Sequence, residues 1–312
     1  MKKPRLLVVG SSNTDMIIKL ACIPRPGETL LGGHFVTAPG GKGANQAVAA
    51  ARSGGDVTLV ACVGRDMFGD RAIAGFKADK INTRHIRRDA KAPSGVALIF
   101  VAESGENSIA VASGANAKLL PADIQNAEAA FKTARMLVMQ LETPLPAIAA
   151  AARLAKKHKV PVILNPAPAA PLAPSLLKRI SIITPNETEA ELLTGIKVTD
   201  DASAEKAARS LISQGVQNVI ITLGPKGAYL CNNGTSRLIP GFPVKATDTT
   251  AAGDTFNGAL AVALSEGRPL AEAVCFANAA AAISVTRLGA QPSAPTRKEI
   301  DAFLKRKSTL VD

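Results

Sequence analysis

The chain has 312 residues, 47% of them hydrophobic and 20% charged, which is typical of a folded globular protein and too apolar for a disordered one. Its 25 glycines and 20 prolines show no period, which excludes collagen-like and low-complexity proteins. The net charge of +12 raises the question of nucleic-acid binding, but aromatic residues make up 3% and Trp is absent, so a stacking platform is missing. We expect no nucleic-acid partner, and attribute the charge to a polyanionic small substrate or to a solvated basic surface.

Neither a signal peptide nor a membrane span is predicted. The N-terminus passes from Met1–Arg5 directly into a short apolar run without an h-region or a cleavage site. The longest weakly polar run, residues 271–285, is too short for a bilayer and contains Asn278. We therefore expect a cytoplasmic protein without a membrane partner.

Short β-branched runs alternate with helical stretches through most of the chain. The runs are apolar on both faces, which is typical of buried parallel strands; they cover residues 6–9, 57–62, 136–141, 160–164, 180–184 and 219–223. The helical stretches cover residues 44–52, 68–79, 145–158, 187–193 and 204–214. This alternation predicts an α/β fold, with an open, mostly parallel sheet sandwiched by helices.

Two segments interrupt this alternation near the N-terminal end. Residues 28–37, and residues 96–101 followed by 108–112, are predicted as strands without helices between them; a hairpin loop at 103–107 joins the second pair. We predict a small antiparallel β lid, formed by residues 13–37 and 94–112, over an α/β domain formed by 1–12, 38–93 and 113–312. An ordinary extension of the sheet edge without a ligand role is the alternative.

After Gly241 the pattern changes to two consecutive helices, at about 253–265 and 270–285, with Gly267 at the C-terminal cap position of the first. Small residues at Ala251, Ala252 and Gly253 precede Asp254 where this helix begins. The free N–H groups and the positive dipole end of a helix start form an anion hole, and Asp254 could take a proton from an attacking hydroxyl. A glycine-flanked helix cap without catalytic function explains the same residues equally well.

Three further patches follow predicted strands. The Gly40–Asn45 turn frees the backbone to meet a polar ligand, or is a plain tight turn. Asn13 and Asp15 suit a vicinal diol, or are turn residues. Glu189 could hold hydrated magnesium while Asn186 touches phosphate, or both could complement a helix dipole.

Taken together, these patches resemble the ribokinase (PfkB-type) carbohydrate kinase family. Residues 248–260 satisfy its C-terminal signature, Gly40–Asn45 resembles its N-terminal glycine signature, and Asn186-x-x-Glu189 resembles its magnesium and phosphate motif. Further matches extend through nearly the whole chain, at residues 11–15, 26–28, 140–144, 165–168, 222–224 and 289–293. The resemblance implies ATP-dependent phosphorylation of D-ribose at O5, giving D-ribose 5-phosphate and ADP.

The resemblance also implies residue roles. Asp254 would be the general base, with the backbone amides of Ala251, Ala252, Gly253 and Asp254 stabilising the transferring phosphoryl group. The sugar would contact Asn13, Asp15, Gly41, Lys42, Gly43, Asn45, Glu142 and Asp254. ATP would contact Asn186, Thr222, Gly224, Lys226, Gly227, Gly253 and Asn278, with Mg²⁺ held by Glu189 through water.

An activating K⁺ is implied as well, at Asp248, Thr250, Ser284, Arg287, Gly289 and Ser293, several of them through backbone carbonyls. The lid strands resemble those that pair across a homodimer in this family. Thr250 replaces a bulkier aliphatic residue expected there, Asn278 lies at a variable position, and Pro225 stiffens the nucleotide loop.

Several alternatives stay open. Within the family the sugar could be 2-deoxyribose, fructose or a nucleoside, although Asn13 favours a hydroxyl at its contact and scarce aromatics disfavour a nucleoside. From other classes, the chain could be a sugar-binding regulator without catalysis, or a basic nucleic-acid-binding protein.

Overall fold

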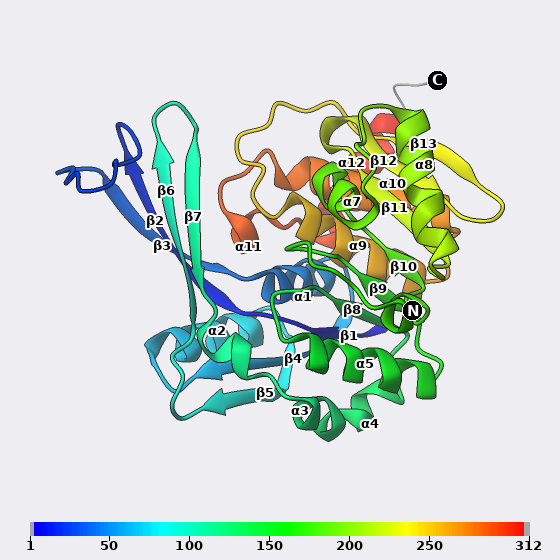
Figure 1. The fold of residues 1–312 in the computed structure, drawn as a ribbon, viewed down its shortest axis with the longest axis horizontal. Helices are drawn as coiled ribbons and strands as arrows, with labels where there is room; N and C mark the ends of the chain where they lie inside the picture. The colour runs from blue at the N-terminus through cyan, green and yellow to red at the C-terminus, as the bar shows by residue number, and fades with distance from the viewer. Residues whose placement is uncertain (1–2, 309–312) are drawn as a thin grey trace.

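The computed structural model describes residues 3–308, and these form two sheets (Figure 1). The larger sheet has nine strands within these residues, in the order β13-β12-β11-β10-β9-β8-β1-β4-β5. Their bounds are β1 (Arg5–Val9), β4 (Asp56–Gly64), β5 (Asn82–Asp89), β8 (Met136–Met139), β9 (Val162–Leu164), β10 (Ile182–Ile183), β11 (Asn218–Thr222), β12 (Gly227–Cys231) and β13 (Ser236–Pro240).

Strand order places a ligand crevice beside β1. All pairings from β5 across to β11 are parallel, and the antiparallel hairpin β12–β13 extends one edge. The chain runs outward from β1 to β4 and β5, then returns to continue with β8 on the other side of β1. Ligands of open α/β sheets bind outside the carboxyl ends of the strands where the order reverses, here beyond Val9 and Met139.

Helices cover both faces of this sheet, because its strands are apolar on both sides. In β1, Leu6 and Val8 belong to one buried cluster and Leu7 and Val9 to the other, as the two-residue period of a strand requires. The first cluster is closed by α1 (Lys42–Arg52), α2 (Met67–Ala78), α9 (Ala252–Ser265), α10 (Leu270–Ser284) and α12 (Arg297–Ser308). The second is closed by α3 (Pro121–Asn126), α4 (Glu128–Phe131), α5 (Leu145–Lys157), α6 (Pro174–Leu177), α7 (Glu187–Thr194) and α8 (Asp201–Ser213).

The smaller sheet, which we call the lid sheet, projects away from the layered part of the molecule (Figure 1). It consists of β3 (His34–Gly40), β2 (Asn13–Leu20), β6 (Gly95–Ala102) and β7 (Asn107–Ala112), in that order. Its outer pairs are antiparallel, whereas the central pair β2–β6 is parallel. The predicted α/β class with a small second sheet is confirmed; the division into two domains stays a prediction.

The strand bounds differ from the sequence prediction mainly in the lid sheet. The predicted strand at 28–37 is found at His34–Gly40, because Gly32 and Gly33 have φ of +100° and +94°, which extended strands exclude. Asn13 and Asp15 open a strand instead of forming a turn. The polar strand β5 and the hairpin β12–β13 were not predicted, while the remaining predicted strands and helices lie within three residues of those found.

Among the described residues, every helix is too short or too polar to span a membrane.

Candidate active site

Where β2 begins and β3 ends, at the base of the lid sheet, Asn13 and Asp15 lie beside the Gly40–Gly41 turn. In the register of β2 and β3, Asn13 faces Gly40 and Asp15 faces Ala38. A Cβ on Gly40 would lie 2.3 Å from the Asp15 carboxylate, and one on Gly41, at φ +89°, would lie 2.6 Å from the Asn13 nitrogen. Glycine permits this approach, so Gly40 lets the turn close against the Asp15 carboxylate and Gly41 lets it close against the backbone nitrogen of Asn13.

The same turn is fastened to the ends of β1 and β8. Gly41 caps α1, Gly43 N donates to Ser11 Oγ at 3.2 Å, and Lys42 N donates to Glu142 Oε2 at 3.0 Å. The Ser11 hydroxyl also donates to Glu142 Oε2. Glu142 is thereby held just beyond the carboxyl end of β8, and a cavity of about 350 Å³ lies between it and Asn13.

Asp254 lies in the first turn of α9 and receives a hydrogen bond on each carboxylate oxygen. Asn45 Nδ2 donates to Oδ2 and Gln46 Nε2 to Oδ1, both at 2.9 Å. Asp254 is 6% exposed and Gln46 is fully buried. Gln46 Oε1 in turn accepts from Gln140 Nε2 at 2.6 Å, and Gln46 Nε2 also reaches Asn165 Oδ1 at 3.1 Å. The carboxylate therefore has a fixed orientation at the crevice.

Charges converge on Lys42. Burial acts to lower the pKa of Lys42, but the carboxylates of Asp254, Glu142, Glu189 and Asp15 outweigh it and raise that pKa. Burial, followed by Glu142 and Asp254, raises the pKa of Asp15 to about 6. Burial also raises the pKa of Asp254, against the opposing effects of Lys42, Asn45 and Gln46. One cation among four carboxylates places the predicted sugar and magnesium residues in a single site.

The start of α9 leaves backbone donors free next to Asp254. Ala251 caps the helix in the left-handed region, at φ +58°, and Ala252 N donates to Thr249 O at 3.2 Å. The N–H groups of Gly253 and Asp254 precede the first full turn and have no helical carbonyl to reach. A Cβ on Gly253 would meet nothing within 4 Å, so open space lies beside Gly253 at the start of the helix. An anion placed there would meet both amides and the positive dipole end of the helix.

The residues predicted for nucleotide binding form a connected group along the edge from β10 to β13. Asn186 pairs with Thr222 in a parallel bridge. Gly224 and Lys226 belong to the 3-10 helix η2 (Gly224–Lys226), which leads to Gly227, and Gly227 faces Pro240 in β13. Asn278 Nδ2 donates to the carbonyls of Ile239 and Pro240, both at 3.1 Å. The amide hydrogens of Asn278 therefore hold β13 against α10, which sequence reasoning had not anticipated.

Asn186 and Glu189 also bond to each other. Glu189 N donates to Asn186 Oδ1 at 2.8 Å, and Asn186 N donates to Glu189 Oε2 at 3.0 Å, a capping box at the start of α7. These atoms therefore stabilise a helix start, which agrees with the alternative that the two residues complement a helix dipole. Burial raises the pKa of Glu189, while Lys42 lowers it.

The residues predicted for the monovalent cation are only partly linked. Asp248 Oδ1 accepts from Thr250 N at 2.9 Å and Oδ2 from Gly289 N at 2.8 Å, and Asp248 N donates to Val285 O, next to Ser284. Burial would raise the pKa of Asp248, but these hydrogen bonds outweigh it and lower that pKa. The side chain of Arg287 pairs instead with Glu299, and Ser293 Oγ bonds Ala290 O within the short helix α11 (Ala290–Ser293).

Sequence reasoning missed the amide side chains that support the site. Gln46, Gln140, Asn165 and Asn116 are all buried and all bonded to site residues or to one another. A signal for two of them was present: Gln140 and Asn165 directly follow β8 and β9, at the carboxyl edge of the sheet.

Comparisons with known proteins agree with this arrangement. Residues 3–297 match the model of the pfkB family carbohydrate kinases. The chain is 51% identical to a ribokinase of Haemophilus influenzae over 96% of this chain and 98% of that protein, and 39% identical to a deoxyribokinase of Salmonella typhimurium over 96% and 98%. The structure of an Arabidopsis thaliana ribokinase complexed with ribose and ATP has a TM-score of 0.90 and 34% identity, covering 97% of this chain and 99% of that one. From the match over nearly its whole length and from these relatives, the chain belongs to the pfkB family of carbohydrate kinases.

Proposed function

We propose that this kinase transfers the γ-phosphoryl group of ATP to O5 of D-ribose, giving D-ribose 5-phosphate and ADP. The observation that carries the proposal is the position of Asp254. A buried carboxylate, fixed on both oxygens by Asn45 and Gln46, adjoins the free amides of Gly253 and Asp254. The relatives named ribokinase, among them one 51% identical, support ribose as the sugar.

The chemical step needs a base and a place for negative charge. Asp254 takes the proton of the O5 hydroxyl as the oxygen bonds to the γ-phosphorus, while the bond from that phosphorus to the β–γ bridging oxygen breaks and ADP leaves. Burial raises the pKa of Asp254 and makes it a stronger base than an exposed carboxylate. The free amides of Gly253 and Asp254 stabilise charge on the transferring group, whereas the Ala252 amide, also predicted for this role, already donates to Thr249 O.

The residues at the base of the lid sheet bind the sugar. Asn13, Asp15 and Glu142 supply side-chain donors and acceptors for the hydroxyls, and Gly41, Lys42 and Gly43 supply backbone close to the sugar. Asn45 Oδ1 is buried and lacks a partner within residues 3–308. A buried acceptor without a partner costs free energy, and a sugar hydroxyl would satisfy it.

ATP is assigned to the group formed by Asn186, Thr222, Gly224, Lys226, Gly227 and Asn278. When bound with ATP, Mg²⁺ offsets the charge of the phosphates. Glu189 suits it, since Oε1 is outside the capping box and carboxylate oxygens are preferred ligands, here through water. The described residues contain no group of three or more His, Cys, Asp or Glu side chains able to enclose a metal, in keeping with an ion held mainly by phosphates.

For the monovalent cation, the fit rests on oxygen donors around Asp248. Its lowered pKa keeps the carboxylate ionised, and it already ties the Thr250 and Gly289 backbone together. K⁺ bound by Asp248 and neighbouring carbonyls would order the loop that leads into α9. Ser284, Arg287 and Ser293 are the other residues that the family resemblance assigns to this cation. The cation would thus shape the anion hole without touching substrate.

A homodimer through the lid sheet is part of the proposal. Register aligns Val36, Ile17, Ile99 and Ile109 in one row across the four strands, on the face that carries Asp15. Val36 is 37% and Ile109 57% exposed. A row of apolar side chains open to water on a sheet face is typical of an interaction surface, and a second lid sheet has the matching chemistry.

The deciding experiment measures ADP release with ribose, 2-deoxyribose, fructose and adenosine, in K⁺ and then in Na⁺ alone. We expect turnover with ribose to be fastest and to rise with K⁺. Faster turnover with 2-deoxyribose would assign the chain the activity named for its deoxyribokinase relative. Absence of turnover with every sugar would overturn the kinase proposal in favour of a binding protein.

A further inference from the structure

We propose that Asn116 fixes the orientation of the Asn13 side chain, so that Asn13 offers its N–H₂ group, and not its carbonyl oxygen, to the sugar. Asn116 lies in the 3-10 helix η1 (Gly114–Lys118), 103 residues along the chain from Asn13. It is a positioning residue, because all of the hydrogen bonds of its side chain within residues 3–308 are to Ser12 and Asn13. The inference rests on the proposed function for the identity of the ligand.

Backbone groups determine which way the Asn116 amide points. Ser12 N, which can only donate, donates to Asn116 Oδ1 at 2.8 Å. Ser12 O, which can only accept, accepts from Asn116 Nδ2 at 3.1 Å. Turning the Asn116 amide over would place donor against donor and acceptor against acceptor, so its orientation is fixed.

The orientation of Asn13 then follows from that of Asn116. The second hydrogen of Asn116 Nδ2 is directed to Asn13 Oδ1, at 2.7 Å. With its oxygen engaged there, Asn13 has its Nδ2 on the other side, and no partner for Nδ2 exists in the described part of the chain. Asn13, Asn116 and Glu142 all line the 350 Å³ cavity, and we assign the free donor to that site.

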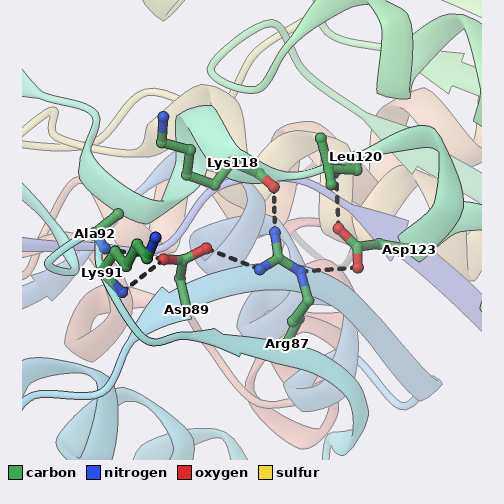
Figure 2. A network of polar contacts seen from close by, with 7 residues as sticks. All are labelled: Arg87, Asp89, Lys91, Ala92, Lys118, Leu120 and Asp123. Atoms are coloured by element: carbon green, nitrogen blue, oxygen red, sulfur yellow. Dashed lines mark hydrogen bonds and ion pairs between the residues drawn. The ribbon is translucent and has the colours of Figure 1, made fainter.

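Asn116 is itself held by a rigid frame. Ala115 N donates to Pro93 O at 2.7 Å, and a Cβ on Gly114, at φ +50°, would lie 2.3 Å from the same oxygen. Figure 2 shows the second support: Arg87 donates to Asp123 Oδ1 and to Asp89 Oδ2, both at 2.9 Å, and to the Lys118 carbonyl at the end of η1. The segment that carries Asn116 is therefore fastened at both ends.

The fixed orientation of the Asn13 amide restricts which sugars can bind. Asp15, two residues along the same strand face, is an acceptor when ionised, whereas Asn13 is restricted to donating. The sugar atom at Asn13 must therefore accept a hydrogen bond, and it need not donate one. Fluorine in place of that hydroxyl keeps an acceptor, although a weak one, whereas hydrogen in its place leaves the donor unpaired once the sugar covers it.

The test compares 2-deoxy, 2-deoxy-2-fluoro, 3-deoxy and 3-deoxy-3-fluoro ribose as substrates. At one of the two positions, we expect KM for the fluoro sugar to be about three- to tenfold lower than for the deoxy sugar, the size of one neutral hydrogen bond. In Asn116→Asp, both carboxylate oxygens accept, so Asn13 turns Nδ2 toward them and its oxygen toward the sugar. The fluoro advantage then disappears or reverses.

Controls separate this effect from loss of folding or added charge. Asn126→Asp adds the same charge on the exposed end of α3 and keeps the fluoro advantage. An added charge acts alike on both sugars, so the ratio of their KM values reports hydrogen-bond direction alone. Asn13→Asp leaves Asn116 in place and should also lose the fluoro advantage. It replaces Asn116→Asp in the test if that variant melts below the assay temperature.

Two results overturn the inference. One is a fluoro advantage that persists in both Asn116→Asp and Asn13→Asp; the other is a wild-type enzyme that turns over ribose with equal KM for the fluoro and deoxy sugars at both positions. Absence of ribose turnover in the wild type is a different result, which contradicts the proposed function itself.

Discussion

Gln46 donates to the Oδ1 atom of Asp254 at 2.9 Å, across 208 positions of sequence. The contact joins the second turn of α1 to the first turn of α9 and is entirely enclosed by protein at Gln46. It orients the Asp254 carboxylate, which takes the proton of the sugar hydroxyl in the proposed reaction.

Asp254→Asn should lower kcat by about 100-fold or more, with a much smaller change in KM for ribose, because it removes a general base while keeping the shape of the site. Asp201→Asn, at an exposed position in the first turn of α8, is the matched control and should leave kcat unchanged. Steady-state kinetics of both variants provide the measurement. Turnover retained in Asp254→Asn would remove the residue from this role.

Gln46→Leu should lower kcat and shift the acid limb of the kcat–pH profile to higher pH. The variant removes one of the hydrogen-bond donors that lower the pKa of Asp254, so a larger fraction of Asp254 is protonated at a given pH. Thermal melts in parallel should show a loss of about 1–3 kcal/mol, since Asn165 and Gln140 lose their partner as well. An unshifted limb would show that Gln46 has only a packing role.

Lower pH should weaken sugar binding while it stabilises the unliganded fold, through Asp15. Burial and the neighbouring carboxylates raise its pKa from 3.8 to about 6 in the folded protein. Below that pH Asp15 is protonated and accepts fewer hydrogen bonds, so kcat/KM for ribose should fall.

Between those two pKa values the folded state binds more protons than the unfolded state, so the contribution of Asp15 to stability decreases as pH rises. Kinetics and melts of wild type and Asp15→Asn test both signs. The variant should lose the acid limb in kcat/KM, and a wild-type limb that is equally present in the variant would assign it to another group.

Ile109→Asp should convert a dimer to a monomer, whereas Leu98→Asp should not. Both side chains are about half exposed, but Ile109 belongs to the apolar row on the Asp15 face, and Leu98 is on the opposite face of the lid sheet. Light scattering after size-exclusion chromatography reports the mass. Equal behaviour of the two variants would contradict a dimer through this row.

Asp248→Asn should reduce the stimulation of turnover by K⁺, with ribose binding little changed. An amide has one acceptor oxygen where the carboxylate has two, so either Thr250 N or Gly289 N loses its partner and the charge is gone. Turnover against K⁺ concentration is the readout. An unchanged K⁺ dependence would place the cation elsewhere.

Much of the layered fold was predictable because its strands are apolar on both faces. Among the strands that were missed, β5 is of another kind: it reads Asn-Thr-Arg-His-Ile-Arg-Arg-Asp and is only partly buried, so hydropathy did not mark it. Pairing with β4 at the sheet edge, a long-range contact, decides its conformation. The lid bounds were missed because the positive φ of Gly32 and Gly33 has no unique sequence signal.

For the site, the residues that the family resemblance marked were largely brought together, but two of their buried supports, Gln46 and Asn116, were not predictable. Gln46 is enclosed within an Ala-rich helix, where a polar residue carries no sign of its partner. Asn116, in the 3-10 helix η1, bonds to Asn13 from 103 positions away in the sequence. Such pairs depend on how α1 lies against α9 and how η1 lies against β2, which only the assembled fold specifies.

The attachment of the lid sheet has a mechanical consequence. Asn13 and Asp15 are the first and third residues of β2, whereas Leu20 ends it. At about 3.3 Å per residue, Leu20 is roughly 23 Å from Asn13 and Asp15 only about 7 Å. A pivot at Asn13 through about 20° would therefore carry the far end of the strand about 8 Å and Asp15 about 2 Å. The lid sheet is a lever whose fulcrum lies at the sugar-binding residues, so it can open wide to admit a sugar while those residues hardly leave their places.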